Sequence, residues 1–199
     1  MSFLERTTLL LGAEKMQRLS AAHVLIVGIG GVGAYAAEMI CRAGVGTLTL
    51  VDADCVSPSN INRQLIALHS TIGQSKVEVL AARLRDINPD VTLHLRQEFL
   101  TAESAAQLVS DGHFDFVVDA IDTIQPKVAL LATCLKERVR VVSSMGAGAK
   151  TDISSIQFSD IWQTYHCGLS KSVRSGLTKA GLKGRKLPVV FSAQQADRN

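Results

Sequence analysis

The feature that most limits how this chain can fold is a regular alternation of short apolar runs with longer amphipathic segments. Five runs have the length of strands and are apolar on both faces, and the segments between them have the length of helices. Strands of this kind need cover on both sides, which a parallel sheet with helices on each face provides. The sequence therefore predicts an α/β protein with a doubly wound, mostly parallel, Rossmann-like sheet. The expected strands are 23–28, 47–52, 91–96, 115–119 and 139–144, and the expected helices are about 32–43, 75–87, 102–111 and 126–138.

A glycine-rich loop, GIGGVG at residues 28–33, joins the first expected strand to the first expected helix. Its glycines allow a tight turn, a close approach of the backbone to a phosphate, and close packing of the helix on the sheet. The start of the helix adds unpaired N–H groups that favour an anion. Asp52, at the end of the second strand, suits a ribose hydroxyl. The predicted nucleotide-binding residues of this region are Gly28, Gly30, Gly31, Gly33 and Asp52.

Two cations indicate which nucleotide binds. Arg63 lies in the segment NINRQ at residues 60–64, and Lys76 follows Gly73 by three residues at the start of a helix. A nicotinamide enzyme holds its pyrophosphate with the glycine loop, whereas an adenylating enzyme must also stabilise the negative charge of departing pyrophosphate. Either cation alone would be interpreted as a solvated surface residue. Together, at this spacing, they predict ATP.

In their order along the chain, these motifs resemble the E1-like superfamily, which includes the activating enzymes of ubiquitin and the adenylyltransferases of thiamine and molybdopterin synthesis. The resemblance covers about residues 6–149 and rests on GxGGxG, DxD at 52–54, NxxRQ at 60–64 and GxxK at 73–76. It implies that ATP activates a carboxylate, that Asp52 binds the ribose, and that phosphates are bound by Asn60, Arg63 and Lys76. The remaining members of the implied ATP site are Asp54 and Gln64.

Two further residues gain roles from the same resemblance. Asp119-Ala120-Ile121-Asp122 follows the fourth strand, at the sheet edge where ligands of such folds bind. Asp119 is interpreted as a cap of that loop, and Asp122 matches a residue that approaches Mg²⁺ and the triphosphate. Arg6 matches an arginine that reaches the triphosphate of a dimer partner, which implies a symmetric homodimer. The expected catalytic residues are thus Arg6, Arg63, Lys76 and Asp122.

The four cysteines help to identify the acceptor, because none of them forms a CxxC pair. Relatives that adenylate sulfur-carrier proteins usually hold zinc with two such pairs. The chain more closely resembles the tRNA threonylcarbamoyladenosine dehydratases, on RTTLLLG at 6–12, VDAIDT at 118–123, GAG at 146–148 and PVVFS at 188–192. This resemblance implies an enzyme that cyclises N6-threonylcarbamoyladenosine next to the tRNA anticodon. ATP would activate the carboxylate as an acyl-adenylate, with net loss of water.

Residues 161–196 contain no acidic side chain. An apolar stripe at three- and four-residue steps, from Leu169 to Ala180, predicts a helix that exposes cations. A solvated basic helix is the ordinary interpretation of such a pattern. The absence of acids over 36 residues favours tRNA phosphates as the partner instead. The candidate tRNA-binding residues are Lys171, Arg174, Lys179, Lys183, Arg185 and Lys186.

These patterns divide the chain by chemistry into an ATP-binding adenylation domain, 1–150, and a basic extension, 151–199, that is short relative to the family. A shortened extension would leave a strand edge uncovered. No apolar run approaches the roughly 20 residues of a membrane span and no signal pattern opens the chain, so a cytoplasmic location is expected.

Three alternatives to the tRNA-modifying enzyme stay open at this point. One is an adenylyltransferase for the C-terminus of a ubiquitin-like sulfur carrier, with a sulfur-transfer partner. Another is a non-catalytic E1-like binding subunit. The least favoured is a nicotinamide oxidoreductase.

Overall fold

The computed structural model describes residues 3–196, which form two compact units. Within these residues, the first unit runs to Phe99 and includes Phe114–Phe116. The second unit comprises Leu100–His113 and the chain from Val117 onward. Compactness therefore divides the chain near residues 100 and 117, whereas the predicted division at residue 150 follows chemistry and stays a prediction.

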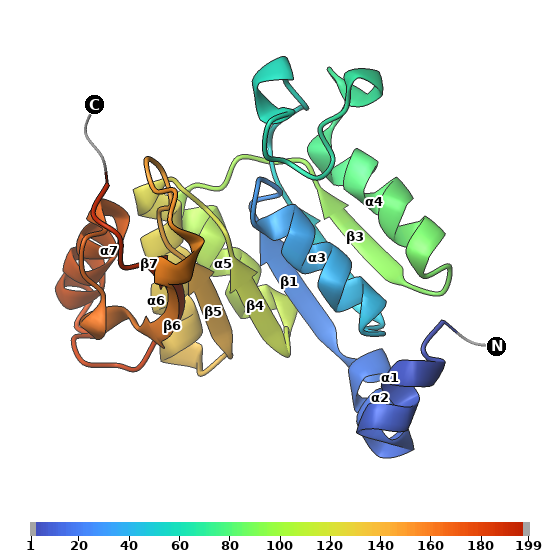
Figure 1. Cartoon of the computed structure of the whole chain (residues 1–199). Coiled ribbons are helices and arrows are strands. Elements are labelled where there is room, and N and C mark those ends of the chain that lie inside the picture. Colours follow the sequence, from blue (N-terminus) through green and yellow to red (C-terminus); the bar gives the residue numbers. More distant parts are fainter. Residues whose placement is uncertain (1–2, 197–199) are drawn as a thin grey trace. The chain divides into compact units, whose positions relative to one another are not determined.

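The first unit carries a parallel three-stranded sheet in the order β3-β2-β1 (Figure 1). His23 pairs with Thr47, and Thr47 pairs with Thr92, so the three strands start at the same edge. The elements are α1 (Glu5–Leu11), α2 (Ala13–Ala21), β1 (His23–Val27), α3 (Gly33–Arg42), β2 (Thr47–Val51), α4 (Lys76–Ile87) and β3 (Thr92–Arg96), with short 3-10 helices at Pro58–Asn60 and His69–Thr71.

Burial explains why these segments form a layered unit. In β1 and β2, four of five residues are buried on both faces, as a parallel sheet requires. Helix α3 buries one stripe that includes Ala34, Ala37 and Cys41. Glu38 on the same helix accepts charge-assisted hydrogen bonds from Arg42 and from Arg83 of α4. The bond from Arg83 holds the pKa of Glu38 below its usual range and ties the two helices together.

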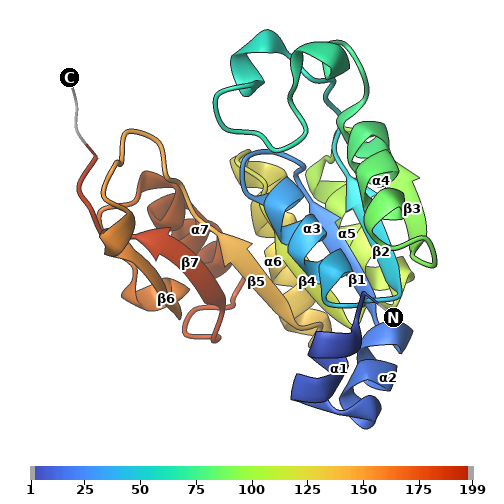
Figure 2. The ribbon, with the colours of Figure 1, turned by 45° about the vertical axis from the view of Figure 1, so that its right-hand side comes forward.

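The α1–α2 hairpin lies at the amino ends of the strands (Figure 2). A Cβ atom at Gly46, just before β2, would lie 1.9 Å from the carbonyl oxygen of Ser20. The Gly46 N–H also donates to the carbonyl of Leu19 at 3.2 Å. Only glycine permits this approach of α2 to the turn before β2, so the hairpin is fixed at that edge.

The second unit has four strands in the order β4-β5-β7-β6. Strands β4, β5 and β7 are parallel, and β6 is antiparallel to β7. Strand β6 lies at the edge of this sheet, and its side chains Ile156 and Phe158 are exposed. The elements are α5 (Ala102–Gly112), β4 (Phe116–Asp119), α6 (Ile124–Glu137), β5 (Val141–Ser144), β6 (Ile156–Asp160), α7 (Gly168–Lys179) and β7 (Pro188–Ser192), with 3-10 helices at Ile153–Ser155 and Ile161–Gln163.

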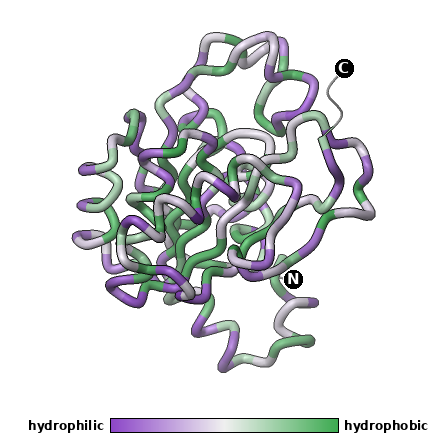
Figure 3. The backbone as a smooth tube through the Cα atoms, turned by 90° about the vertical axis from the view of Figure 1, so that its left-hand side faces the viewer, coloured by the Kyte–Doolittle hydropathy of each residue, from purple (hydrophilic) through white to green (hydrophobic). Residues whose placement is uncertain are grey.

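The strands and helices expected from the sequence are all present, with bounds shifted by one or two residues. The predicted α/β class with a mostly parallel sheet is confirmed, because only β6 runs antiparallel among the strands of the described residues. Hydrophobic stretches of the chain gather inside and hydrophilic ones lie mainly on the outside (Figure 3). No helix within residues 3–196 is long and apolar enough to cross a membrane.

Candidate nucleotide-binding site

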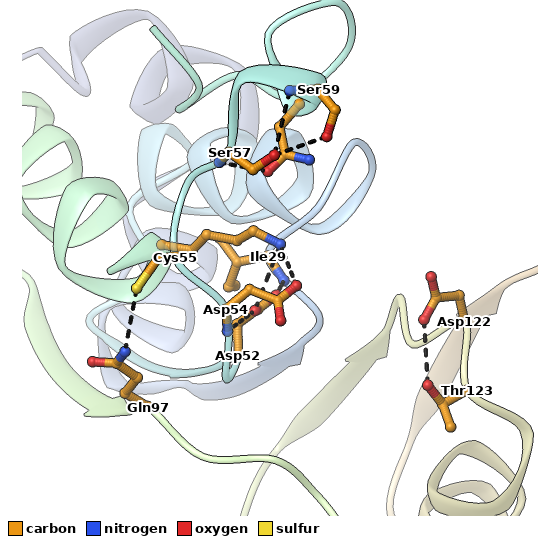
Figure 4. Close-up of polar contacts among 11 residues, drawn as sticks. Ile29, Asp52, Asp54, Cys55, Ser57, Ser59, Gln97, Asp122 and Thr123 are labelled. Carbon is orange, nitrogen blue, oxygen red and sulfur yellow. Dashed lines mark hydrogen bonds and ion pairs between the residues drawn. The ribbon is translucent and has the colours of Figure 1, made fainter. Parts of the chain in front are cut away.

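The glycine loop begins at the carboxyl end of β1 with a backbone conformation that favours glycine. Gly28 has a φ of 90°, which is unfavourable for residues with a Cβ atom. The next residue, Ile29, donates its N–H to Asp52 Oδ2 at 2.6 Å, and Asp54 donates its N–H to Oδ1 at 2.9 Å (Figure 4). The Asp52 carboxylate therefore fixes both the glycine loop and the turn after β2. Each oxygen keeps a lone pair for a further donor.

The segment that carries Arg63 and Gln64 crosses over the glycine loop. A Cβ atom at Gly31 would lie 3.5 Å from the Arg63 carbonyl oxygen and 3.6 Å from its Cγ. At Gly30, the nearest atom would be Gln64 Nε2, at 3.8 Å. Residues more than 30 positions apart in the chain thus lie next to each other, as the motif order predicted. Larger side chains at these two glycines would fill the space between the segments.

Local hydrogen bonds hold the segment in this position. Asn60 Oδ1 accepts from the N–H of Ser57 at 3.1 Å and closes the 3-10 turn Pro58–Asn60 (Figure 4). Arg63 is exposed, and its Nη1 donates to the carbonyl of Ser59 at 3.0 Å and to Asn62 Oδ1 at 2.9 Å. The guanidinium is therefore steadied from one side, and further N–H groups stay available to a phosphate.

Lys76 lies at the first position of α4 with its side chain only 5% exposed. Its Nζ is 2.7 Å from Asp54 Oδ2 and 3.8 Å from Asp52 Oδ1. The ammonium thus lies beside the carboxylate that holds the glycine loop. A phosphate that binds Lys76 would compete with the exposed Asp54 for it, and displacing an exposed carboxylate costs little.

Two buried polar atoms in this region suit a polar ligand. Among the described residues, Gln64 Oε1 and Ser75 Oγ are buried and lack a hydrogen-bond partner. Leaving such a group unsatisfied costs about 1–3 kcal/mol, which a ligand or water can recover. Gln64 borders the glycine loop and Ser75 precedes Lys76, so the residues present fit a bound nucleotide.

The loop that carries Asp122 belongs to the second unit and is held by a buried network. Asp119, the last residue of β4, accepts at Oδ1 from the N–H of Ile121 at 3.1 Å, which confirms its interpretation as a loop cap. Its Oδ2 lies 2.7 Å from Lys127 Nζ and accepts from Ser143 Oγ at 2.5 Å. Asp122 itself is exposed and accepts from Thr123 Oγ1 at 3.5 Å (Figure 4).

Lys127 was missed by the sequence reasoning. Its place in the apolar stripe of α6 with Leu130, Leu131 and Cys134 was the available signal, because a lysine there must be buried. The thiol of Cys134 is inert at neutral pH, since burial raises its pKa to about 12.

A magnesium ion that binds together with a nucleotide needs few protein ligands. Within residues 3–196, no three His, Cys, Asp or Glu side chains are grouped to hold a metal ion. Mg²⁺ bound with a nucleotide usually takes one or two carboxylates and completes its shell with phosphates and water. A single exposed carboxylate such as Asp122 fits that pattern.

Arg6 is exposed on α1, at the amino edge of the sheet of the first unit, whereas the glycine loop lies at the carboxyl edge (Figure 2). The structure therefore does not bring Arg6 to the glycine loop of its own chain. A role at a dimer partner's site stays a prediction.

The six predicted tRNA-binding residues of the second unit fall into two groups. Arg174 Nη1 donates to the carbonyls of Ile161 and Thr164 at 3.2 and 3.0 Å, so this cation holds the turn before α7. Trp162 also has a structural contact, because its Nε1 donates to the carbonyl of Arg185 at 2.7 Å. The other five predicted tRNA-binding residues face solvent: Lys171, Lys179, Lys183, Arg185 and Lys186.

Comparison with known proteins gives a consistent family. The model of the ThiF family matches residues 4–188. The tRNA threonylcarbamoyladenosine dehydratase of Bacillus subtilis is 43% identical over 94% of this chain and 73% of its own length. The dehydratase of Escherichia coli is 40% identical over 86% of this chain. A crystal structure of the Escherichia coli enzyme in complex with ATP superposes with a TM-score of 0.90 at 37% identity, covering 96% of this chain and 81% of that one.

This chain aligns with only 63% of the full length of the Escherichia coli relative. The family model matches residues 4–188, a range that includes the glycine loop, the 60–64 segment, Lys76 and the Asp122 loop. The chain therefore belongs to the ThiF family, among the tRNA threonylcarbamoyladenosine dehydratases, as the sequence motifs predicted.

Proposed function

We propose that this chain is an enzyme that uses ATP to cyclise N6-threonylcarbamoyladenosine in tRNA, next to the anticodon. The observation that carries the proposal is a group of residues in the first unit. Arg63 and Gln64 approach the glycine loop, and Lys76 lies beside Asp52, which anchors that loop. Similarity to dehydratases at up to 43% identity supports the same reaction.

Each residue of this group has a role in binding ATP. The glycine loop and the start of α3 would receive phosphate oxygens on backbone N–H groups. Asp52 would accept from the ribose, and Arg63 and Lys76 would pair with the phosphates, assisted by Asn60. As pyrophosphate leaves, these cations would stabilise the charge that develops on it.

The chemistry asks for positioning more than for a nucleophilic side chain. The carboxylate of the modified adenosine attacks the α-phosphate, and pyrophosphate is released. A nitrogen of the same side chain then attacks the activated carbonyl, loses its proton and expels AMP. Because that nitrogen is tethered to the carbonyl, proximity supplies much of the rate. Asp122 would bind Mg²⁺, which supplies Lewis-acid neutralisation of the phosphates.

The tRNA would contact the exposed cations of the second unit, with Lys183, Arg185 and Lys186 on one short segment before β7. Trp162 donates a hydrogen bond to the Arg185 carbonyl, which holds the backbone of that segment in place. Arg174 is the weakest of the six predicted tRNA contacts, because its guanidinium is used within the protein. A homodimer in which Arg6 reaches the partner's ATP, and a cytoplasmic location, complete the proposal.

Exchange of labelled pyrophosphate into ATP tests this proposal directly. We expect exchange with tRNA that carries threonylcarbamoyladenosine and none with the same tRNA transcribed without modification. Exchange that requires a carrier protein ending in Gly-Gly would instead favour the adenylyltransferase. Binding of ATP without exchange for any acceptor would favour the non-catalytic subunit.

A further inference from the structure

Lys127 is a completely buried lysine with three oxygen partners. Its Nζ lies 2.7 Å from Asp119 Oδ2 and donates to the carbonyls of Ile121 and Ser144, each at 2.9 Å. An ammonium has three N–H donors, so all of them are used. This arrangement satisfies the strict requirement that a buried charge be paired and hydrogen-bonded.

The partners of Lys127 come from the places where two neighbouring strands end. Asp119 is the last residue of β4 and Ser144 the last of β5, while Lys127 lies in the first turn of α6. Ile121 is held at both of its polar backbone groups, since its N–H donates to Asp119 and its carbonyl accepts from Lys127. The two peptide planes that lead into Asp122 are therefore both fixed.

The side chain of Asp122 has little else to define its position. It is exposed, and its hydrogen bond with Thr123 Oγ1 is long, at 3.5 Å. The backbone before it therefore decides where its carboxylate lies. We propose that Lys127 is a positioning residue, which places Asp122 for the reaction by locking the loop between β4 and α6.

Stability alone does not explain a lysine at this place. Replacing a buried ion pair by well-packed apolar residues is often neutral or stabilising. Leu130, Leu131 and Cys134 follow on the same face of α6, so a leucine would continue the stripe. What an apolar residue could not do is donate to the Ile121 and Ser144 carbonyls, which connect the loop to two strands.

Because this role of Lys127 rests on the proposed function of Asp122, the experiment must separate the two. The main variant is the double substitution Asp119→Asn with Lys127→Gln, which removes both charges but keeps hydrogen-bonding groups. Lys127→Arg is the conservative variant that retains the charge. Glu38→Gln is the control, because it neutralises a buried carboxylate in the first unit that pairs with two half-exposed arginines. Thermal unfolding establishes that each variant is folded.

In pyrophosphate exchange, we expect the double substitution to lower kcat by about 10²-fold, as misplacement of a reacting group by about 1 Å can do. The KM for tRNA should stay unchanged, and the Mg²⁺ concentration needed for half-maximal exchange should rise. The single variant Lys127→Arg should keep more of the wild-type kcat than the double variant does. In an Asp122→Ala background the double substitution should cause no further loss, because the two changes act through one group. Independent, multiplying losses would overturn the role.

Hydrogen–deuterium exchange gives a readout that does not depend on activity. The Ile121 N–H should exchange faster in the double variant and at the wild-type rate in the Glu38→Gln control. Unchanged protection of residues 120–123 would overturn the inference about Lys127 whether or not the protein is active. Absence of pyrophosphate exchange in the wild-type protein would instead count against the proposed function.

Discussion

Replacing Lys76 by methionine separates the charge of this residue from its packing, because the two side chains have similar length. Two ion pairs are lost: the short one with Asp54, whose side chain is 67% exposed and which is worth about 0–1 kcal/mol, and the longer one with Asp52, at 3.8 Å. Asp52 keeps its two backbone donors, Ile29 and Asp54. We therefore expect the free energy of unfolding to fall by about 1 kcal/mol or less.

The expected effect on the reaction is much larger. Removing one positioned donor from a site of developing negative charge costs about 10²–10³ in kcat. Pyrophosphate exchange and thermal unfolding of Lys76→Met measure the two quantities, and Lys15→Met, at an exposed lysine of α2, is the control. Wild-type exchange by Lys76→Met would refute the phosphate role. A variant that fails to fold would show that the lysine is structural.

Three further predictions concern other parts of the chain. Burial, and secondly the nearby His94, lower the pKa of His23, so the folded state prefers the neutral imidazole. The contribution of His23 to the unfolding free energy should therefore be complete above pH 6.5 and decrease below it. In thermal melts recorded across a pH series, His23→Gln should show a weaker decrease in that range. Gly46→Ala should cost about 3 kcal/mol, because its Cβ would clash with the Ser20 carbonyl, whereas Gly168→Ala, with open space around it, should leave the unfolding free energy almost unchanged. Changing three exposed cations to alanine should weaken tRNA binding and lower the salt slope of its binding constant by about three, and an unchanged slope would exclude this surface. The three cations are Lys183, Arg185 and Lys186.

The sheet could be predicted because its signal is local. The buried strand β1 contains the continuous apolar run VLIV, and the helices between the strands are amphipathic segments, so each element can be recognised from its own sequence. The direction of β6 could not be predicted in the same way, since five residues do not reveal which way they run. The α1–α2 hairpin was also missed. Neither of its helices contains a buried residue, and its place depends on the tight contact at Gly46.

The order of the motifs along the chain predicted which segments of the candidate site lie close together. The approach of Arg63 to the glycine loop and of Lys76 to Asp52 follows from where parallel strands end. Contacts with backbone carbonyls could not be predicted. Arg174 has the same charge as its neighbours in the sequence, and only the turn at Ile161–Gln163 shows that its guanidinium is used internally. The contacts of Lys127 could not be predicted for the same reason, because its partners lie at or just after the ends of two different strands.

The most direct test of the proposed activity is nucleoside mass spectrometry after incubation with modified tRNA. Purified protein, ATP, Mg²⁺ and tRNA that carries threonylcarbamoyladenosine would be incubated, digested to nucleosides and compared with a reaction without ATP. The account predicts conversion to a product lighter by one water molecule, with one AMP and one pyrophosphate formed for each product. If ATP binds but the nucleoside mass stays unchanged, the proposed activity of this chain is contradicted.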